Sequence, residues 1–207
     1  MIKGDKALNK ALTSLNKEAD RQCRMMYPAA VLALWNEFGW RRERIVKRLC
    51  ICDKVAGECI EHGTEKSMLD MLEEETGIEM TIYGYDKSFH EIPYLSKDAW
   101  DGKPPTRQEL LYIRTRQRKW LGPLILANLC LGLHRSDGFG PERIQRFIEA
   151  VDVYRMKFGN NVKEYAREME RVTGISGKML FDCRLEKGHD GKRVLTATSD
   201  AGYKNTS

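Results

Sequence analysis

The chain has 207 residues, of which 42% are apolar and 31% charged, so it can bury a core and is not a disordered polyelectrolyte. Its formal charge of +5 is unevenly placed: residues 1–80 carry 13 basic and 14 acidic side chains, whereas residues 104–177 carry 13 and 8. No apolar run approaches the roughly 20 residues of a membrane span, and the polar start lacks a signal-peptide pattern. The six cysteines then indicate free thiols, and we expect a cytoplasmic protein.

The first 80 residues predict four helices, because apolar side chains recur there at spacings of three and four. These helices cover residues 5–26, 29–38, 41–60 and 65–76. Pro28 separates the first two, since proline lacks the N–H that continues a helix. We therefore expect one amphipathic helix, a short buried helix, and two further helices after a Gly39 turn.

Residues 81–103 are rich in aromatic side chains and lack a helical period, which predicts an ordered connector. After it, Thr106 and Glu109 form a capping-box pattern that opens another helix. Pro123 ends that helix and precedes a second buried run, and Pro141 begins a further helix. Residues 178–207 lose the periodicity and predict a partly disordered tail.

Two stretches of the chain contain the same local sequence pattern. Phe38-Gly39-Trp40 is followed by Glu43-Arg44-Ile45, and Gly138-Phe139-Gly140-Pro141 by Glu142-Arg143-Ile144. Each copy closes on a shared triplet, Thr76-Gly77-Ile78 in the first and Thr173-Gly174-Ile175 in the second. Such repetition indicates an internal duplication. The predicted fold is all-α, with two duplicated four-helix units (residues 1–80 and 104–177) joined by an aromatic connector.

No motif points to catalysis or to a bound metal. The sequence contains neither a Gly-x-Ser-x-Gly pattern nor a phosphate-binding glycine loop. Cys50, Cys52, Cys59 and His62 are side chains that zinc binds, but they fall on one predicted helix, where Cys50 and Cys52 lie about 200° apart. We interpret the cysteines as core residues, and we expect no enzyme activity, no cofactor and no metal.

Basic residues gather in the second half and at the start of the helix after Gly39. The main predicted contact cluster consists of Arg114, Arg116, Arg118 and Lys119, and Arg41, Arg42 and Arg44 of the first half come second. Arg107, Arg143 and Arg146 are further predicted contact residues. Arginine and lysine neutralise phosphates, so these positions predict a nucleic-acid or nucleoprotein partner. The alternative is a solvated basic face, paired with acids such as Glu37 or Glu43.

The stretch from Leu32 to Ile78 and the stretch from Leu131 to Ile175 resemble small, mostly uncharacterised proteins of phages and prophages in Gram-positive bacteria. Those proteins share a Leu-His…Phe-Gly-Phe-Gly…Arg-Ile turn and a Thr-Gly-Ile end. The resemblance covers most of residues 28–177 and brings no catalytic residues with it. The first copy departs from the pattern, with Trp40-Arg41 in place of the second Phe-Gly.

Proteins of this class include regulators and inhibitors of host defence, among them anti-CRISPR proteins. The resemblance therefore implies a non-enzymatic phage accessory protein in the cytoplasm of a bacterial host. We expect it to bind a host nucleoprotein or nucleic acid, for instance as an anti-CRISPR-type inhibitor of a defence nuclease. The alternative is a phage DNA-binding transcriptional regulator.

Overall fold

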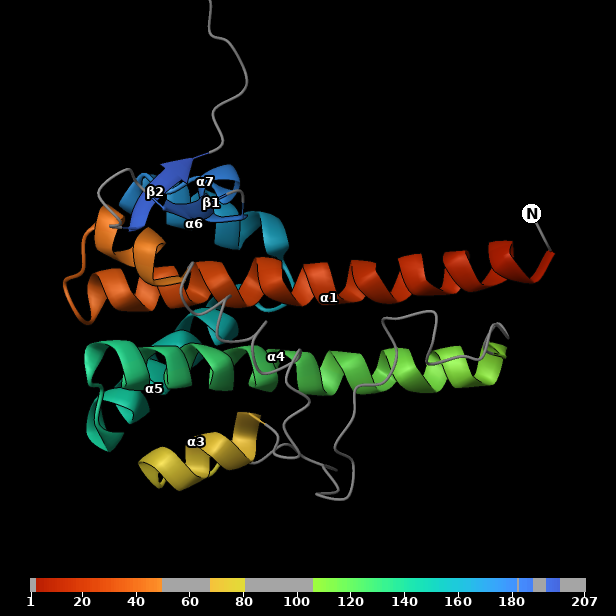
Figure 1. Ribbon diagram of the computed structural model, residues 1–207, viewed down its shortest axis with the longest axis horizontal. Helices are drawn as coiled ribbons and strands as arrows, with labels where there is room; N and C mark the ends of the chain where they lie inside the picture. The colour runs from red at the N-terminus through yellow and green to blue at the C-terminus, as the bar shows by residue number, and fades with distance from the viewer. Residues whose placement is uncertain (1–2, 50–67, 81–105, 182, 188–192, 198–207) are drawn as a thin grey trace, which may run out of the picture.

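The structure, a computed structural model, describes residues 3–49, 68–80, 106–181, 183–187 and 193–197 (Figure 1). These residues confirm the predicted all-α architecture, to which one short β-hairpin is added near the C-terminal end. The predicted aromatic connector and the four candidate zinc ligands of the first half lie outside the described residues.

Two long helices run side by side through the molecule. Helix α1 spans Lys3–Asn36 and helix α4 spans Arg107–Asp137, and both run in the same direction in Figure 1. Their C-terminal halves are surrounded by the shorter helices, whereas their N-terminal halves extend beyond them. The centre of the fold is thus a parallel pair of helices, one from each half of the sequence.

The predicted breaks at Pro28 and Pro123 are wrong, because both prolines lie inside continuous helices. A proline in a helix interior costs about 3 kcal/mol through its missing N–H and its ring clash. The run that follows Pro28, from Ala29 to Leu34, is completely buried. Each fully buried Val or Leu side chain contributes roughly 1.5–3 kcal/mol, so packing of this run offsets the cost of the proline.

Helices α1 and α4 end in the same way. Gly39 and Gly138 adopt left-handed conformations, with φ of 64° and 63°. The next residue in each copy then donates its N–H to the carbonyl six positions earlier, Trp40 to Leu34 at 3.1 Å and Phe139 to Leu133 at 3.3 Å. A left-handed glycine thus ends each helix, because glycine adopts this conformation without strain. Residues 134–137, which resemble a short insertion in the sequence, instead form the last turn of α4.

Shorter helices follow each long helix. In the first half, residues 42–49 are helical and α3 spans Met68–Thr76. In the second half, α5 spans Pro141–Phe158 and α6 spans Val162–Thr173. The predicted capping box of Thr106 and Glu109 is confirmed at α4. Helix α6 begins at the N-cap residue Asn161, whose side chain makes no cap hydrogen bond and whose carbonyl accepts the N–H groups of Glu164 and Tyr165.

The two Thr-Gly-Ile ends form the same hydrogen bonds. Thr76 Oγ1 donates to the Leu72 carbonyl at 2.6 Å, and Thr173 Oγ1 donates to the Met169 carbonyl at 2.7 Å. Each hydroxyl also accepts the N–H of the isoleucine two positions later. The glycine between them is again left-handed in both copies. The shared triplet is therefore a helix-stop device whose chemistry is identical in the two halves.

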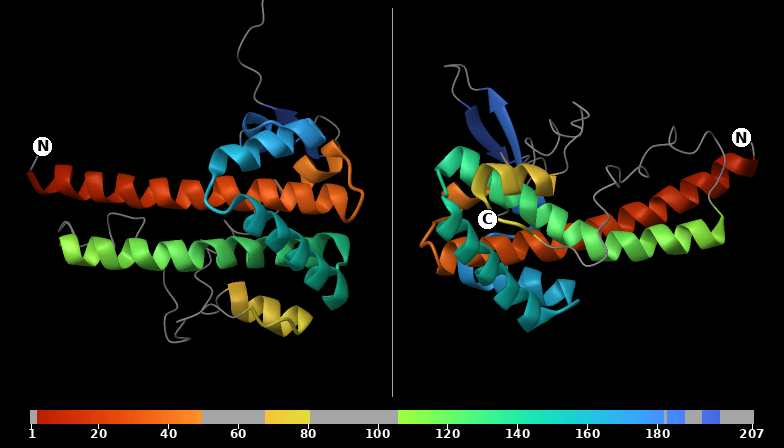
Figure 2. Two further views of the ribbon diagram at one scale, coloured as in Figure 1. Left: turned by 180° about the vertical axis from the view of Figure 1, so that it is seen from behind. Right: turned by 90° about the horizontal axis from the view of Figure 1, so that it is seen from below.

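Helices α3, α5 and α6 each pack on the long helix of the other half. Helices α5 and α6 lie mainly against α1, while α3 lies against α4, as both views of Figure 2 show. In the described part of the chain, the buried apolar side chains form one continuous core, which includes Leu32, Ile45, Leu72, Ile144 and Met169. The halves of the sequence are thus interleaved in space and share one core.

The segment after α6 docks on α1. Helix α7 spans Gly177–Phe181 and buries Leu180, and the Phe181 ring lies 6.0 Å from the ring of Tyr27. The aromatic contact of this segment is therefore with the first half of the chain. Beyond it, β1 (Cys183–Lys187) pairs antiparallel with β2 (Arg193–Ala197), within a stretch for which the sequence showed no periodicity.

Candidate functional site

The two glycine turns meet at one end of the molecule, where α1 and α4 both finish. We call this surface the turn end and define it as residues 36–48 and 135–147. The Phe38 ring centre lies 5.1 Å from that of Phe139, and the Trp40 ring lies 5.7 Å from Phe139 in an edge-on arrangement. Phe139 and Trp40 are buried, so these rings join the two turns from within.

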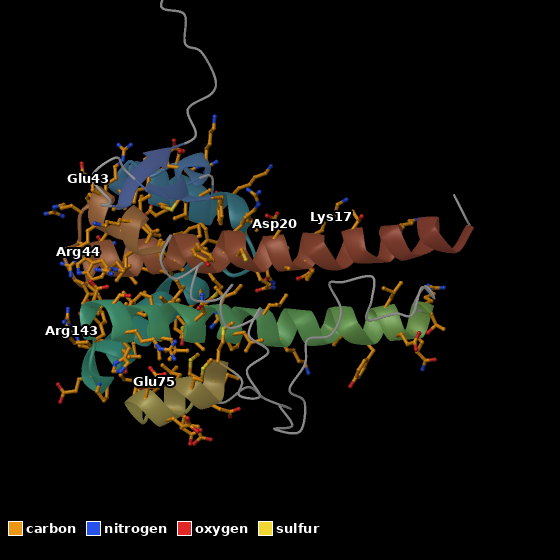
Figure 3. All side chains as sticks on the ribbon, viewed as in Figure 1. Lys17, Asp20, Glu43, Arg44, Glu75 and Arg143 are labelled. Carbon is orange, nitrogen blue, oxygen red and sulfur yellow. The ribbon has the colours of Figure 1, made fainter. Side chains whose placement is uncertain are left out.

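Arginines cover these rings from outside. The guanidinium carbon of Arg44 lies 3.9 Å from the centre of the Trp40 ring, and that of Arg143 lies 3.9 Å from the Phe139 ring. Both contacts are in the range of cation–π interactions. Arg44 and Arg143, like Trp40 and Phe139, are 99 positions apart in the sequence. Figure 3 shows Arg44 and Arg143 at the same end of the molecule.

Acidic side chains of each half hold arginines of the other half. The Asp137 carboxylate, whose side chain is only 3% exposed, lies 3.3 Å from Arg44 Nη2 and 2.7 Å from Arg48 Nε. The Arg48 contact is an ion pair that lacks hydrogen-bond alignment at Asp137 Oδ2. In return, Arg146 Nη2 donates to Glu37 Oε1 at 2.5 Å. At the turn end, ion pairs therefore join the two halves, and each half provides an acid that binds an arginine of the other.

One further cross-half pair connects α4 with α3. Arg135 donates to both carboxylate oxygens of Glu75, through Nε at 3.0 Å and through Nη2. This hydrogen bonding lowers the pKa of Glu75 below its usual value. Both side chains are about one-third exposed, so the pair is a modest stabilising contact.

Four cations of the turn end lack an acidic partner. Within the described residues, Arg41, Arg42, Lys47 and Arg143 are exposed and have no carboxylate at ion-pair distance. Among the described residues, Arg42 Nη2 lies 3.0 Å from the Met179 sulfur. The turn end as a whole carries eight basic and four acidic residues, a net charge of +4. Nearly all of the chain's formal excess of +5 is thus gathered at one end.

The structure separates the predicted contact residues into two groups. Arg41, Arg42 and Arg44 from the first half are brought together with Arg143 and Arg146 from the second, at the turn end. Arg107 and Lys119 lie exposed on the N-terminal half of α4, and Lys119 is 18 residues from the end of that helix, about 27 Å along its axis. Arg114, Arg116 and Arg118 share this part of the α4 backbone, but their side chains lie outside what the structure describes.

Sequence reasoning missed the ring cluster and the buried acid. Phe139, an aromatic residue among basic positions, is completely buried and supports Arg143 from beneath. Aligning the two copies without a gap would have placed Asp137 opposite Phe38 and Phe139 opposite Trp40, next to the matching glycine of each half. This ungapped alignment is the sequence signal from which these residues could have been identified.

Other kinds of site find no support in the described part of the chain. None of its helices has the length and apolar composition that a membrane crossing requires. The side chains that the structure places include no group of three or more histidine, cysteine, aspartate or glutamate residues arranged to hold a metal ion.

No protein-family model matches this chain, and comparisons with curated proteins and with solved structures find no significant similarity.

Proposed function

We propose that the protein is a non-enzymatic phage accessory protein that binds a host nucleoprotein or nucleic acid through the turn end. An anti-CRISPR-type inhibitor of a defence nuclease is one concrete form of this function. The phage assignment rests on the resemblance of the two turns to phage and prophage proteins. The binding assignment rests on the charges and rings of the turn end.

The observation that carries the proposal is the meeting of two distant stretches in one basic surface. Eight basic residues, drawn from positions about 100 apart, gather there with only four acids. Two of these acids, Glu37 and Asp137, are engaged in ion pairs that hold arginines in place. Arg41, Arg42 and Arg143 remain exposed toward solvent without an acidic partner among the described residues. Such a surface attracts phosphate-bearing partners.

We further propose that the chain arose by internal duplication. Both copies have the same left-handed glycine, the same six-residue backbone hydrogen bond, and the same arginine over an aromatic ring. Both also end on a threonine that bonds back to its helix and forward to an isoleucine. In this proposal each half corresponds to one subunit of an ancestral dimer, in which the short helices of one subunit packed on the long helix of the other.

The test is a pull-down from bacterial lysate with the tagged full chain, with and without nuclease treatment. A variant that carries Arg41→Glu, Arg42→Glu and Arg143→Glu serves as the comparison. The control variant carries Arg167→Glu and Lys163→Glu on the outer face of α6, where both residues are exposed. The proposal predicts that the turn-end variant loses its partner while the control keeps it. Retention of every partner by the turn-end variant would show that this surface is merely solvated.

The alternative function is a phage DNA-binding transcriptional regulator. Apolar helix, glycine turn and basic helix follow one another in both halves, which is the order found in helix-turn-helix proteins. A regulator would capture DNA that is lost after nuclease treatment and at raised salt. An inhibitor would instead retain a protein partner that survives the nuclease.

A further inference from the structure

We infer that the turn end engages the two phosphate backbones of double-helical DNA, with Arg44 and Arg143 contacting opposite strands. This inference rests on the proposed function, and it names the chemical form of the partner, whether the duplex is bare or part of a nucleoprotein. Three features of the turn end lead to it: fixed guanidinium groups, their pairwise arrangement, and their separation.

The guanidinium groups are fixed by buried rings. Trp40 is 3% exposed and Phe139 is 0% exposed, so neither ring can move without disturbing the core. Arg44 and Arg143 each lie 3.9 Å from the centre of one of these rings. A guanidinium that covers a ring directs its N–H groups sideways, and these match the oxygens of a phosphate. Arg44 already donates from Nη2 to Asp137 at 3.3 Å, so its other N–H groups would face the partner. Because its rotamer is already restricted, less entropy is lost when it binds.

Each half contributes one equivalent pair of an arginine and an aromatic ring. Arg44 with Trp40 in the first half repeats as Arg143 with Phe139 in the second, and the two long helices that carry these turns run parallel. Two equivalent cations related in this way suit a partner that presents two equivalent anionic ridges. A DNA duplex is such a partner, because its two phosphate strands flank each groove. An acidic protein surface has no such built-in pairing.

The two guanidinium groups also lie within reach of one partner. Arg44 is linked to Trp40, Trp40 to Phe139 and Phe139 to Arg143 by contacts of 3.9, 5.7 and 3.9 Å. Those three contacts set an upper limit of about 14 Å on the distance between the two guanidinium carbons. A span up to this limit allows the two side chains to face the two edges of a major groove, which is about 12 Å wide in B-form DNA. Arg41, Arg42 and Lys47 flank the pair and provide further cations for the backbone.

The inference is tested by fluorescence anisotropy with a labelled 20-base-pair DNA duplex, its separate strand, and a polyglutamate peptide. Five phosphate contacts predict a slope of about −4.5 in a plot of log affinity against log salt concentration. Arg44→Gln and Arg143→Gln should each weaken duplex binding about eightfold at 0.1 M salt and reduce the slope by about 0.9. Arg167→Gln, a change on α6 at a side chain that pairs within its own helix, should alter neither quantity.

Folding is controlled separately, because Arg44 also contacts Asp137. Arg44→Lys keeps the cation, so it should leave the salt slope unchanged even if affinity falls. Equal losses from the two glutamine variants, together with a preference for duplex over single strand, support two-strand contact. Equal affinity for the single strand through the same arginines would overturn that inference while the proposed function stands. Binding of polyglutamate without duplex binding would overturn it in favour of an acidic protein partner, and failure to bind any nucleic acid or nucleoprotein would overturn both.

Discussion

The threonine of the Thr-Gly-Ile end offers a sharp test of the structure. In the second half, Thr173 is 5% exposed, and its hydroxyl accepts the N–H of Ile175 at 3.1 Å. Ile175 is itself completely buried, so no water can replace this acceptor. Thr173→Val keeps the shape of the side chain but removes the oxygen. The buried N–H of Ile175 is then left without its partner.

The expected cost follows from that burial. Leaving a buried N–H unsatisfied costs about 1–3 kcal/mol. A change of 2 kcal/mol lowers the melting temperature of a chain of this size by roughly 4–8 °C. The equivalent change in the first half, Thr76→Val, should cost about 0.5–1.5 kcal/mol, because the bond to Ile78 is longer, 3.3 Å, and Ile78 is only partly buried.

Urea unfolding followed by circular dichroism at pH 7 would measure both free energies of unfolding. Thr173→Ser and Thr76→Ser are the matched controls, since serine keeps the hydroxyl and loses only a methyl group. The serine variants should retain most of the stability that the valine variants lose. If Thr173→Val is neutral, or if Thr76→Val is the more damaging change, then the hydroxyl does not terminate these helices in the way described.

Other predictions concern single ionisable groups. Hydrogen bonding to Arg135 lowers the pKa of Glu75, so this pair stabilises the fold above the usual carboxyl pKa and loses its contribution as the pH falls through the folded pKa. Glu75→Gln should therefore cost up to about 1 kcal/mol at pH 7 and progressively less in urea titrations at falling pH. Burial raises the pKa of Tyr165 above 10. The neutral phenol therefore stabilises the fold below that pH, and this contribution is lost as the pH rises through the folded pKa. Tyr165→Phe should reduce the loss of folding stability between about pH 9 and 11. Asp137→Asn removes the anion that two arginines share and should cost about 1–3 kcal/mol at pH 7, whereas Glu43→Gln on the exposed surface should be near neutral in the same assay.

Local chemistry made much of the fold predictable. Apolar spacing predicted helices where α3, α5 and α6 are found, and the capping pattern of Thr106 and Glu109 marked the start of α4. Gly39 and Gly138 marked the ends of the two long helices, because a left-handed residue is needed there. Each of these signals depends on interactions within a few residues, so the sequence contains all of the partners.

The predicted helix breaks at Pro28 and Pro123 were wrong because the continuation of each helix depends on interactions with residues far away in the sequence. The local preference of both prolines is to end a helix, but the energy that overrides it comes from packing against distant elements. Ala30, Val31 and Leu32 are fully buried, and α1 is enclosed there by α4, α5 and α6. Helix propensity is a weak prior against burial on that scale. The length of α1 therefore depended on tertiary contacts that a periodicity analysis does not include.

The composition of the candidate site could not be predicted from the charge profile along the chain. That profile assigned the positive excess to residues 104–177, since the first 80 residues are balanced. The turn end instead takes five basic residues from the first half and three from the second. Acids that balance the first half along the sequence, such as Glu73 and Glu74, lie on α3, outside the turn end. Charge along the sequence and charge in space thus differ because the fold redistributes the residues.

The interleaved packing explains why this surface is a property of the whole chain. Asp137 belongs to the second half, yet it holds Arg44 and Arg48 of the first, and Glu37 of the first holds Arg146 of the second. The ring of Phe139 completes the support under both turns by contacting Phe38 and Trp40. Each half contains the ring that supports its own arginine, but the acids that hold Arg44 and Arg146 come from the other half. Any partner that recognises the paired arginines therefore recognises the assembled fold, and changes in the core beneath Phe139 should affect binding as directly as changes in the arginines themselves.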